Sequence, residues 1–207
     1  MSEQPEMELR DQVRRVYSAA AREPKGKHPF PVGRRFAASV GYPPELLDSL
    51  PAEAADAFCG VSNVAVFAGI PEGAVVLDLG CGAGLDSLIA ARRTGPGGKV
   101  FAIDFSEAML GRAAEAVRDA GADNVVIRRA DAEALPLDDA SIDVALVNGI
   151  FNLNPAREAI FRELARVVRP GGELFGAEII VREMPRVLKP ITNLARKSNR
   201  SRADWFA

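Results

Sequence analysis

The sequence predicts an α/β protein with a doubly wound, mostly parallel sheet behind an N-terminal helical cap. From residue 75 onward, short apolar runs alternate with stretches of helical periodicity, as parallel strands joined by crossover helices require. The runs are continuously apolar rather than alternating, which is typical of strands covered by helices on both faces. No strand pattern appears before residue 75, so the preceding segment is expected to be helical.

The first seventy residues are expected to form the cap. Residues 1–20 carry apolar side chains at spacings of three and four, which predicts a short amphipathic helix that Pro24 and Gly26 end. Residues 25–33 are too rich in proline and glycine for regular structure, and two short helices are expected at 34–40 and 44–50. We therefore divide the chain into a cap at 1–70, a core at 71–181 and a basic extension at 182–207.

The core begins with a strand at 75–79 and a helix at 84–94. A Gly-Pro-Gly-Gly turn then leads to a strand at 99–103, a helix at 106–120 and a strand at 124–128. After a loop, a fourth strand is expected at 142–147 and a helix at about 156–168. That helix ends at an Arg-Pro-Gly-Gly segment, and a last strand is expected at 173–181.

The composition fits a single soluble domain. The 207 residues are 48% hydrophobic and 26% charged, and the formal charge of −2 gives no general attraction to nucleic acid or anionic membranes. The first residues lack the positive-then-apolar pattern of a leader, so none is expected, and no apolar run comes near the roughly 18 residues of a membrane span. We therefore expect a cytoplasmic protein with reduced thiols at Cys59 and Cys81, and no membrane or nucleic-acid partner. Seven basic residues in the extension are expected to form a solvated face.

A glycine-rich loop follows the first predicted strand. Its order, Gly-x-Gly-x-Gly, differs from the Gly-x-Gly-x-x-Gly of dinucleotide sites, and the acid Asp78 precedes it. A carboxylate beside the loop would repel a pyrophosphate and would suit a ligand with an α-ammonium and a sulfonium. S-adenosylmethionine is therefore preferred over NAD. The loop residues expected to bind the cofactor are Gly80, Cys81, Gly82 and Gly84.

Further site residues are expected where the next strands end. Asp104 lies twenty residues past the last glycine, where a β-α-β unit brings a carboxylate to the ribose diol of a nucleoside. Asp131 could accept from an adenine amino group while the Ala132 N–H meets a ring nitrogen. Phe105 is included in the cofactor site, and Asn148 is expected beside the methionine moiety or the substrate.

These motifs resemble the class I S-adenosylmethionine-dependent methyltransferases from residue 75 to 181. The similarity rests on the loop, the two acids, Ser-Ile-Asp-Val at 141–144 and Leu-x-x-Val-x-Arg-Pro-Gly-Gly at 164–172. Gly-Ala-Gly-Leu-Asp-Ser at 82–87 and Asn-Gly-Ile-Phe-Asn-Leu at 148–153 resemble arsenite methyltransferases more closely. The resemblance implies a Rossmann-like fold and methyl transfer to a small-molecule acceptor. It also implies a terminal antiparallel hairpin, for which no strand pattern remains after residue 181. A partner chain, as in a homodimer, could cover that edge, or the chain is a fragment.

The resemblance implies thiolates that hold As(III), and the chain departs from that pattern. Gly149 stands where those enzymes have a cysteine after the Asn of the fourth strand, and their N-terminal cysteine falls near Val61, with Cys59 the nearest thiol. Cys81 is expected to be a small buried residue of the cofactor loop. We therefore predict no metal site and keep arsenite as the leading named acceptor of an enzyme whose acceptor is otherwise unassigned.

Three polar residues are candidates for catalysis. His28 is the one histidine and a possible base in the cap, and Asn63 and Asn152 could orient an acceptor by hydrogen bonds. Two other functions stay open at this point. The chain could be a cofactor-binding methyltransferase-like module without turnover, or an NAD-dependent oxidoreductase, which the loop spacing disfavours.

Overall fold

The computed structural model describes residues 4–180, and a five-stranded parallel sheet forms its centre. The strands are β1 (Val75–Leu79), β2 (Lys99–Asp104), β3 (Val125–Arg129), β4 (Ile142–Asn148) and β5 (Val168–Ala177). Their order is β3-β2-β1-β4-β5, and every neighbouring pair is parallel. The order reverses between β1 and β4, which is the place where a doubly wound sheet opens a crevice for a ligand. The predicted fold class is confirmed.

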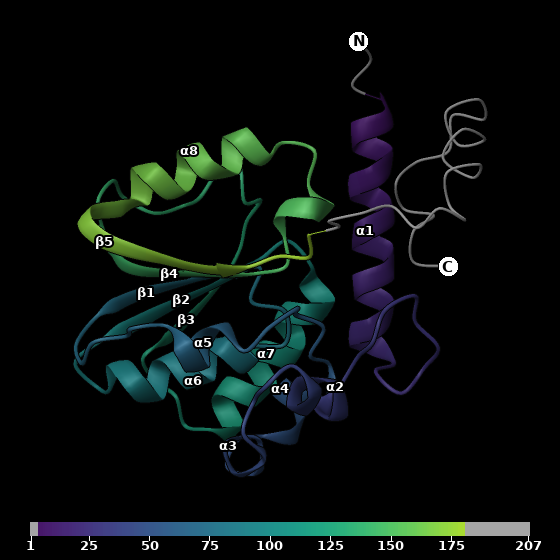
Figure 1. Ribbon diagram of the computed structural model, residues 1–207, viewed down its shortest axis with the longest axis horizontal. Helices are drawn as coiled ribbons and strands as arrows, with labels where there is room; N and C mark the ends of the chain where they lie inside the picture. Colours follow the sequence, from purple (N-terminus) through teal and green to yellow (C-terminus); the bar gives the residue numbers. More distant parts are fainter. Residues whose placement is uncertain (1–3, 181–207) are drawn as a thin grey trace.

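Helices cover both faces of the sheet (Figure 1). On one face lies α8 (Arg157–Val167), and on the other lie α6 (Leu85–Thr94) and α7 (Glu107–Asp119). Strand β1 shows why its apolar run is continuous: Leu77 and Leu79 pack with Ile160 of α8, whereas Val76 packs with Leu88 of α6. Both faces of this strand are therefore buried by helices.

The last strand starts earlier than the sequence predicts. Val168 already pairs with Ile142, but the next paired residues are Glu173 and Val144, so residues 169–172 form an irregularity within β5. Pro170 lacks a donor for the sheet, and Gly171 has a positive φ of 80°. The Arg-Pro-Gly-Gly segment thus kinks a strand rather than separating a helix from one.

Four short helices precede the sheet: α2 (Arg34–Ser39), α3 (Pro44–Asp48), α4 (Ala52–Asp56) and α5 (Val64–Phe67). The sequence predicts the first two but misses α4 and α5. Tyr42 and Leu47 from this region are buried in the same cluster as Val76 and Val100 of the sheet. The helical segment therefore shares its core with the sheet. A cap that ends at residue 70 remains a prediction.

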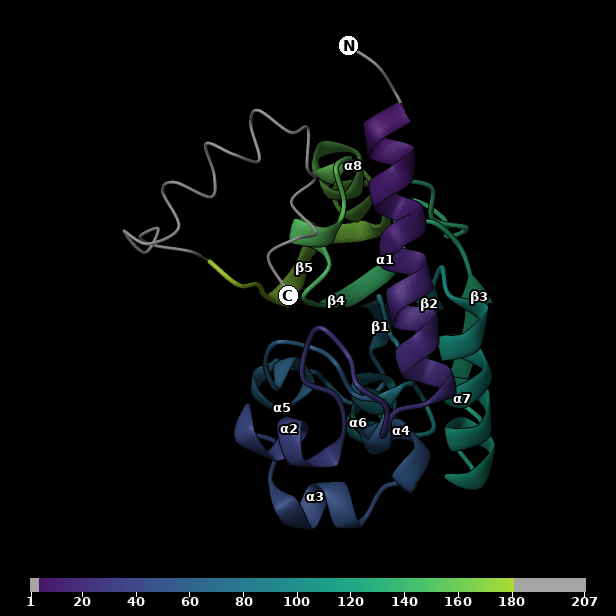
Figure 2. The same cartoon turned by 90° about the vertical axis from the view of Figure 1, so that its right-hand side faces the viewer.

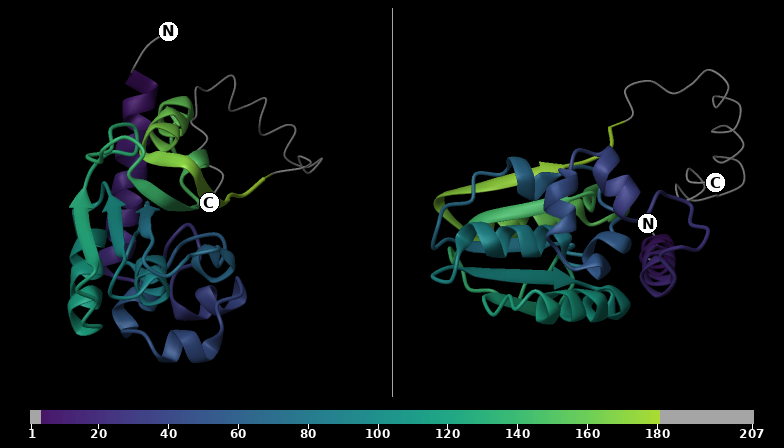
Figure 3. Two further views of the ribbon diagram at one scale, coloured as in Figure 1. Left: turned by 90° about the vertical axis from the view of Figure 1, so that its left-hand side faces the viewer. Right: turned by 90° about the horizontal axis from the view of Figure 1, so that it is seen from below.

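A long first helix, α1 (Gln4–Arg22), runs across the carboxyl ends of the strands. It is seen along its length in Figure 2 and end-on beyond the strand tips in the right panel of Figure 3. The Ser18 and Ser106 hydroxyls lie 3.1 Å apart, and Arg112 donates a hydrogen bond to the Ala21 carbonyl, so α1 is fastened to α7. Helix α1 thereby closes the side of the molecule where the switch point lies.

The described part of the chain has no helix long and apolar enough to cross a membrane. Strand β5 ends at Ala177, four residues before the predicted end at residue 181, and residues 178–180 are not in a strand. The basic extension and the missing hairpin lie outside the described residues.

Candidate functional site

The glycine loop between β1 and α6 turns sharply at the mouth of a cavity. Gly80, Gly82 and Gly84 have φ values of 77°, 53° and 87°, a region that favours glycine. A side chain at Gly80 would collide with Ile150, and the Gly80 and Cys81 N–H groups donate to the Ile103 carbonyl at 2.8 and 3.0 Å. The loop is thus held close to β2, and α6 starts directly after it.

Asp104 connects the end of β2 with this loop. Its Oδ2 accepts a hydrogen bond from the Gly82 N–H at 3.0 Å, and its Oδ1 accepts from the Ser106 N–H at 2.8 Å. The side chain is 8% exposed, and burial raises its pKa against the opposing effect of these N–H donors. The carboxylate therefore shapes the loop and also lines the cavity.

Asp78, inside β1, is a second buried acid on the cavity wall. Its Oδ2 accepts a hydrogen bond from the Ser87 hydroxyl at 2.5 Å. Burial, followed by the neighbouring Asp86 carboxyl, raises the pKa of Asp78 to about 8. Within residues 4–180, no arginine or lysine forms an ion pair with Asp78, Asp86 or Asp104. A group of buried acids without a cation favours a positively charged ligand.

The outer end of the cavity is lined by Asp131 and Ala132, just past β3, and by Phe105. Arg10 of α1 lies 3.1 Å from an Asp131 oxygen, in an ion pair that is about half exposed. The Arg14 guanidinium lies 5.6 Å from the centre of the Phe105 ring. Helix α1 therefore contacts the residues predicted to surround adenine.

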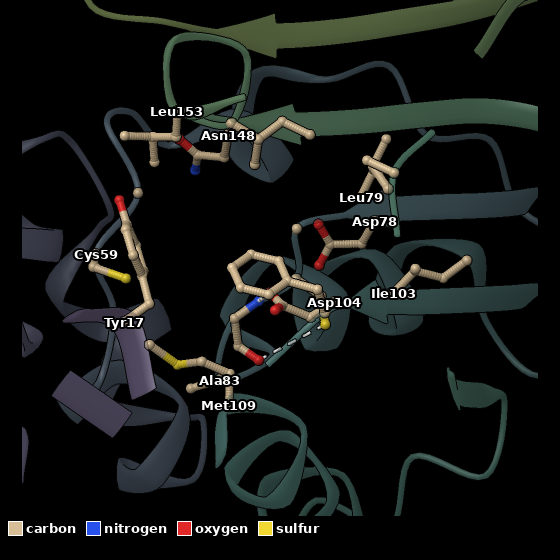
Figure 4. A pocket seen from close by; sticks show the side chains of 18 of the residues that line it. Tyr17, Cys59, Asp78, Leu79, Ala83, Ile103, Asp104, Met109, Asn148 and Leu153 are labelled. Atoms are coloured by element: carbon tan, nitrogen blue, oxygen red, sulfur yellow. Dashed lines mark hydrogen bonds between the residues drawn. The ribbon is translucent and has the colours of Figure 1, made fainter. Parts of the chain in front are cut away.

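The inner wall of the cavity is largely apolar and comes from the cap and from the segment after β4 (Figure 4). Tyr17 of α1, Cys59 and Leu153 lie across the cavity from Asp78 and Asp104, and Phe58, next to Cys59 in the chain, also lines the cavity. The Tyr17 ring packs on Phe30 at 4.7 Å between ring centres. Burial raises the pKa of the Cys59 thiol to about 12 and that of the Tyr17 phenol further, so both groups stay protonated near neutral pH.

Asn148, at the end of β4, lines the cavity but its amide is bonded to protein. Its Oδ1 accepts from the Val61 and Ser62 N–H groups at 2.8 and 3.1 Å. Its Nδ2 donates to the Ser62 carbonyl at 2.7 Å and to Asp86 at 2.9 Å. The side chain thereby joins the segment before α5 to the start of α6.

The three candidates for catalysis do not line the cavity. The His28 ring lies 2.8 Å from the Glu23 carbonyl, Asn63 donates to the Gly41 carbonyl at 2.8 Å, and Asn152 donates to the Ile179 carbonyl at 2.6 Å. Each of these side chains is thus bonded to a backbone carbonyl. The structure gives none of the three a contact with the cavity.

The predicted cofactor residues, in contrast, come together. All but Gly84 line the cavity: Asp78, Gly80, Cys81, Gly82, Asp104, Phe105, Asp131, Ala132 and Asn148. Sequence reasoning missed the contributions of Arg10, Arg14 and Tyr17. These residues lie on one face of α1 at helical spacing, a signal that cannot be told from ordinary core packing until the docking of the helix is known.

Val61 and Gly149 stand at the two positions where the resemblance implies cysteines, and these two positions lie next to each other. A Cβ at Gly149 would lie 3.0 Å from Val61 Cγ1, so both positions belong to one apolar contact. Cys59 lines the cavity nearby, while Cys81 packs with Ala102 and Leu110. No three His, Cys, Asp or Glu side chains among residues 4–180 form a group that could hold a metal ion.

Comparisons with known proteins agree with this geometry. A family model described as a methyltransferase domain matches residues 70–204. An arsenite methyltransferase of Halobacterium salinarum is 36% identical over 141 residues, which is 68% of this chain and 36% of that protein. A demethylmenaquinone methyltransferase of Bacillus subtilis is 33% identical over 116 residues, 56% of this chain and 49% of that protein. The chain thus spans a third to a half of these curated relatives.

Solved structures have the same fold. An arsenic(III) S-adenosylmethionine methyltransferase from Chlamydomonas reinhardtii is 29% identical with a TM-score of 0.58, covering 79% of this chain and 54% of that one. An S-adenosylmethionine-dependent methyltransferase from Aquifex aeolicus is 27% identical with a TM-score of 0.51, covering 63% of this chain and 73% of that one.

Proposed function

Since this chain belongs to the class I S-adenosylmethionine-dependent methyltransferases, of the arsenite methyltransferase-like kind, we propose that its cavity binds S-adenosylmethionine and that it methylates a small-molecule acceptor. The observation that carries the proposal is the pair of buried acids, Asp78 and Asp104, beside a glycine loop and with no arginine or lysine paired to them among residues 4–180. When bound, S-adenosylmethionine supplies a methyl group on a positively charged sulfur.

The residues of the cavity fit this cofactor in three places. Asp78 would compensate its positive charge, and Asp104 keeps lone pairs for a ribose diol after accepting from Gly82 and Ser106. At the outer end, Asp131 and the Ala132 N–H would meet adenine, and Phe105 would lie against its ring. These roles follow from position and chemistry and are part of the proposal.

A dinucleotide fits less well. A pyrophosphate would be repelled by Asp78 and would compete with Asp104 for the Gly82 N–H, which is already bonded. The alternative of an NAD-dependent oxidoreductase therefore gains no support from the geometry.

The acceptor would stand between the glycine loop and the inner wall. In-line methyl transfer needs the acceptor lone pair held opposite the breaking bond and water kept out. Phe58 and Leu153 would exclude water, while the Tyr17 hydroxyl would orient the acceptor as a hydrogen-bond donor. The cavity has no histidine or lysine in the described part of the chain, so the acceptor should be a nucleophile that needs little help to lose a proton.

Arsenite is the first acceptor to test, because two relatives carry that activity in their names. Against it, soft As(III) prefers several thiolates, and this wall offers Cys59 while Val61 and Gly149 form an apolar contact. We therefore leave the acceptor open. A cytoplasmic location, consistent with the free thiols Cys59 and Cys81, and a homodimer that covers the outer edge of β5 are also part of the proposal.

The test is transfer of an isotope-labelled methyl group from S-adenosylmethionine to a panel of acceptors, with arsenite plus excess thiol, quinols, thiols and amines. Labelled product with any of them supports an enzyme. Tight cofactor binding without product from any acceptor would favour the binding module without turnover.

A further inference from the structure

The side chain of Asn148 uses its complete hydrogen-bonding capacity inside the protein. A primary amide offers two acceptor lone pairs and two donor hydrogens. Val61 and Ser62 N–H groups occupy the Oδ1, and the Ser62 carbonyl and Asp86 receive the two hydrogens. No position is left for a ligand, although the residue lies at the cavity. The amide therefore acts on the segment that it binds.

Asp86 is the partner that connects this amide to the glycine loop. It lies in the first turn of α6, is 6% exposed, and receives Asn148 at its Oδ2. Its Oδ1 accepts from the Tyr42 hydroxyl at 2.6 Å and from the Ala65 N–H at 3.3 Å. One carboxylate thus joins the cap, α5 and the end of β4 to the helix that begins at the loop.

The segment that rests on Asn148 forms part of the inner wall of the cavity. We name residues 58–62 the acceptor wall. Its first three residues, Phe58, Cys59 and Gly60, line the cavity. A Cβ at Gly60 would lie 2.7 Å from Asn148 Cγ, so the backbone touches the amide directly and only glycine fits.

We propose that Asn148 and Asp86 are positioning residues, which hold the acceptor wall at a fixed place relative to the glycine loop and thereby set where the acceptor stands. The proposal rests on the proposed methyl transfer, in which a misplacement of about 1 Å can cost about a hundredfold in rate. It differs from the expectation that Asn148 contacts the cofactor or the substrate.

The substitution Asn148→Asp tests this with little change of shape. At low pH the new carboxyl is protonated, so it can donate to Asp86 and still accept from Val61 and Ser62, while the bond to the Ser62 carbonyl is lost at every pH. At higher pH two buried carboxylates face each other at the place of a 2.9 Å hydrogen bond, and the contact is lost. The other titratable groups that face this point are Tyr42 by contact and Asp78 behind it, and neither supplies a positive charge.

The measurement is hydrogen exchange of the amides in residues 58–65, expressed as protection factors at about pH 5.5 and about pH 8. In Asn148→Asp, protection should fall by about tenfold or less at the lower pH, where the bond to the Ser62 carbonyl is lost, and by at least about a further tenfold at the higher pH, where the contact with Asp86 is lost too. Asn63→Asp is the matched control, because Asn63 lies in the same region and bonds to a carbonyl rather than a carboxylate. It should change protection equally at both pH values.

The double variant Asn148→Asp with Asp86→Asn exchanges the amide and the carboxylate. Its protection factors should not depend on pH, which keeps the test decisive if the single variant does not fold.

The cofactor affinity of these variants is measured by calorimetry with S-adenosylhomocysteine. The single and double variants should bind it within about threefold of the wild-type affinity at the same pH. A loss of affinity with unchanged exchange would overturn the proposal and make Asn148 a cofactor ligand. Failure of the wild type to bind S-adenosylhomocysteine would instead refute the proposed function.

Discussion

The Asp104 carboxylate accepts a hydrogen bond from the Gly82 N–H at 3.0 Å, which joins the tip of β2 to the glycine loop after β1. The acid holds the loop in its turn through a bond within the protein, so the loop and the acid form one structural unit.

Replacement of Gly80 by alanine should weaken cofactor binding by at least about tenfold, since a residue with a Cβ at positive φ costs about 1–2 kcal/mol and the methyl group would also collide with Ile150. Calorimetry with S-adenosylhomocysteine measures the effect. Gly73→Ala is the control, because Gly73 has nearly the same φ of 76° but nothing within 4 Å of its Cβ position. Equal losses in both variants would show that backbone strain, and not the approach to Ile150, explains the glycine.

Cofactor affinity should rise with pH. A cationic ligand prefers ionised Asp78, and the pKa of this acid is raised to about 8, so the ligand-free protein must first lose a proton near neutral pH. Affinity for S-adenosylmethionine, which carries the sulfonium charge that S-adenosylhomocysteine lacks, should therefore increase between about pH 6 and about pH 8.5, and Asp78→Asn should bind it more weakly without this increase. Calorimetry across this range checks both, and a flat profile in the wild type would contradict the role of Asp78.

Ionisation of Asp78 should lower the stability of the ligand-free protein as the pH rises, although it raises the affinity for the cofactor. The pKa of Asp78 in the folded protein, about 8, lies above the ordinary value of 3.8. The contribution of the protonated acid to the free energy of unfolding is therefore fully present below about pH 4 and is lost as the pH rises through about 8. The free energy of unfolding of the ligand-free protein, measured in urea, should fall over that window. In Asp78→Asn the free energy of unfolding should fall less over the same pH range. An identical decline in the variant and the wild type would assign the pH dependence to other titratable groups.

Tyr17→Phe should lower kcat by about tenfold or more while S-adenosylhomocysteine affinity stays unchanged, because the hydroxyl faces the acceptor side and the ring keeps its packing on Phe30. The assay is methyl transfer with an acceptor found in the panel. An unchanged kcat would remove Tyr17 from the acceptor site, and a large loss of cofactor affinity would place it at the cofactor instead.

Much of the site could be predicted because strand ends share one edge of a parallel sheet. Asp78, Asp104 and Asp131 belong to successive strands or the residues just past them, so their meeting follows from the alternating pattern alone. The short helices α4 and α5 were missed because four or five residues are too few for a helical period. Arg169 to Gly172 resembled a turn, although β5 continues through it with an irregularity.

The contribution of α1 could not be predicted. Its apolar and basic positions fit any amphipathic helix. Contacts with distant residues, such as Ser18 with Ser106 and Arg112 with Ala21, place it across the strand tips, where Arg10 and Tyr17 reach the cavity. Asn148 was expected at the cofactor from its place at the end of β4. That its amide is fully bonded to residues 61, 62 and 86 depends on contacts between distant parts of the chain.

The most direct test of the central claim is calorimetric titration of the wild type and Asp104→Ala with S-adenosylhomocysteine. The matched control is Asp143→Ala, which removes a carboxylate that accepts from the Val75 N–H at 2.6 Å but does not line the cavity. We predict a dissociation constant in the micromolar range for the wild type and the control, and a loss of at least about a hundredfold in Asp104→Ala. Absence of binding by the wild type, or equal affinity in a folded Asp104→Ala variant, would contradict the account.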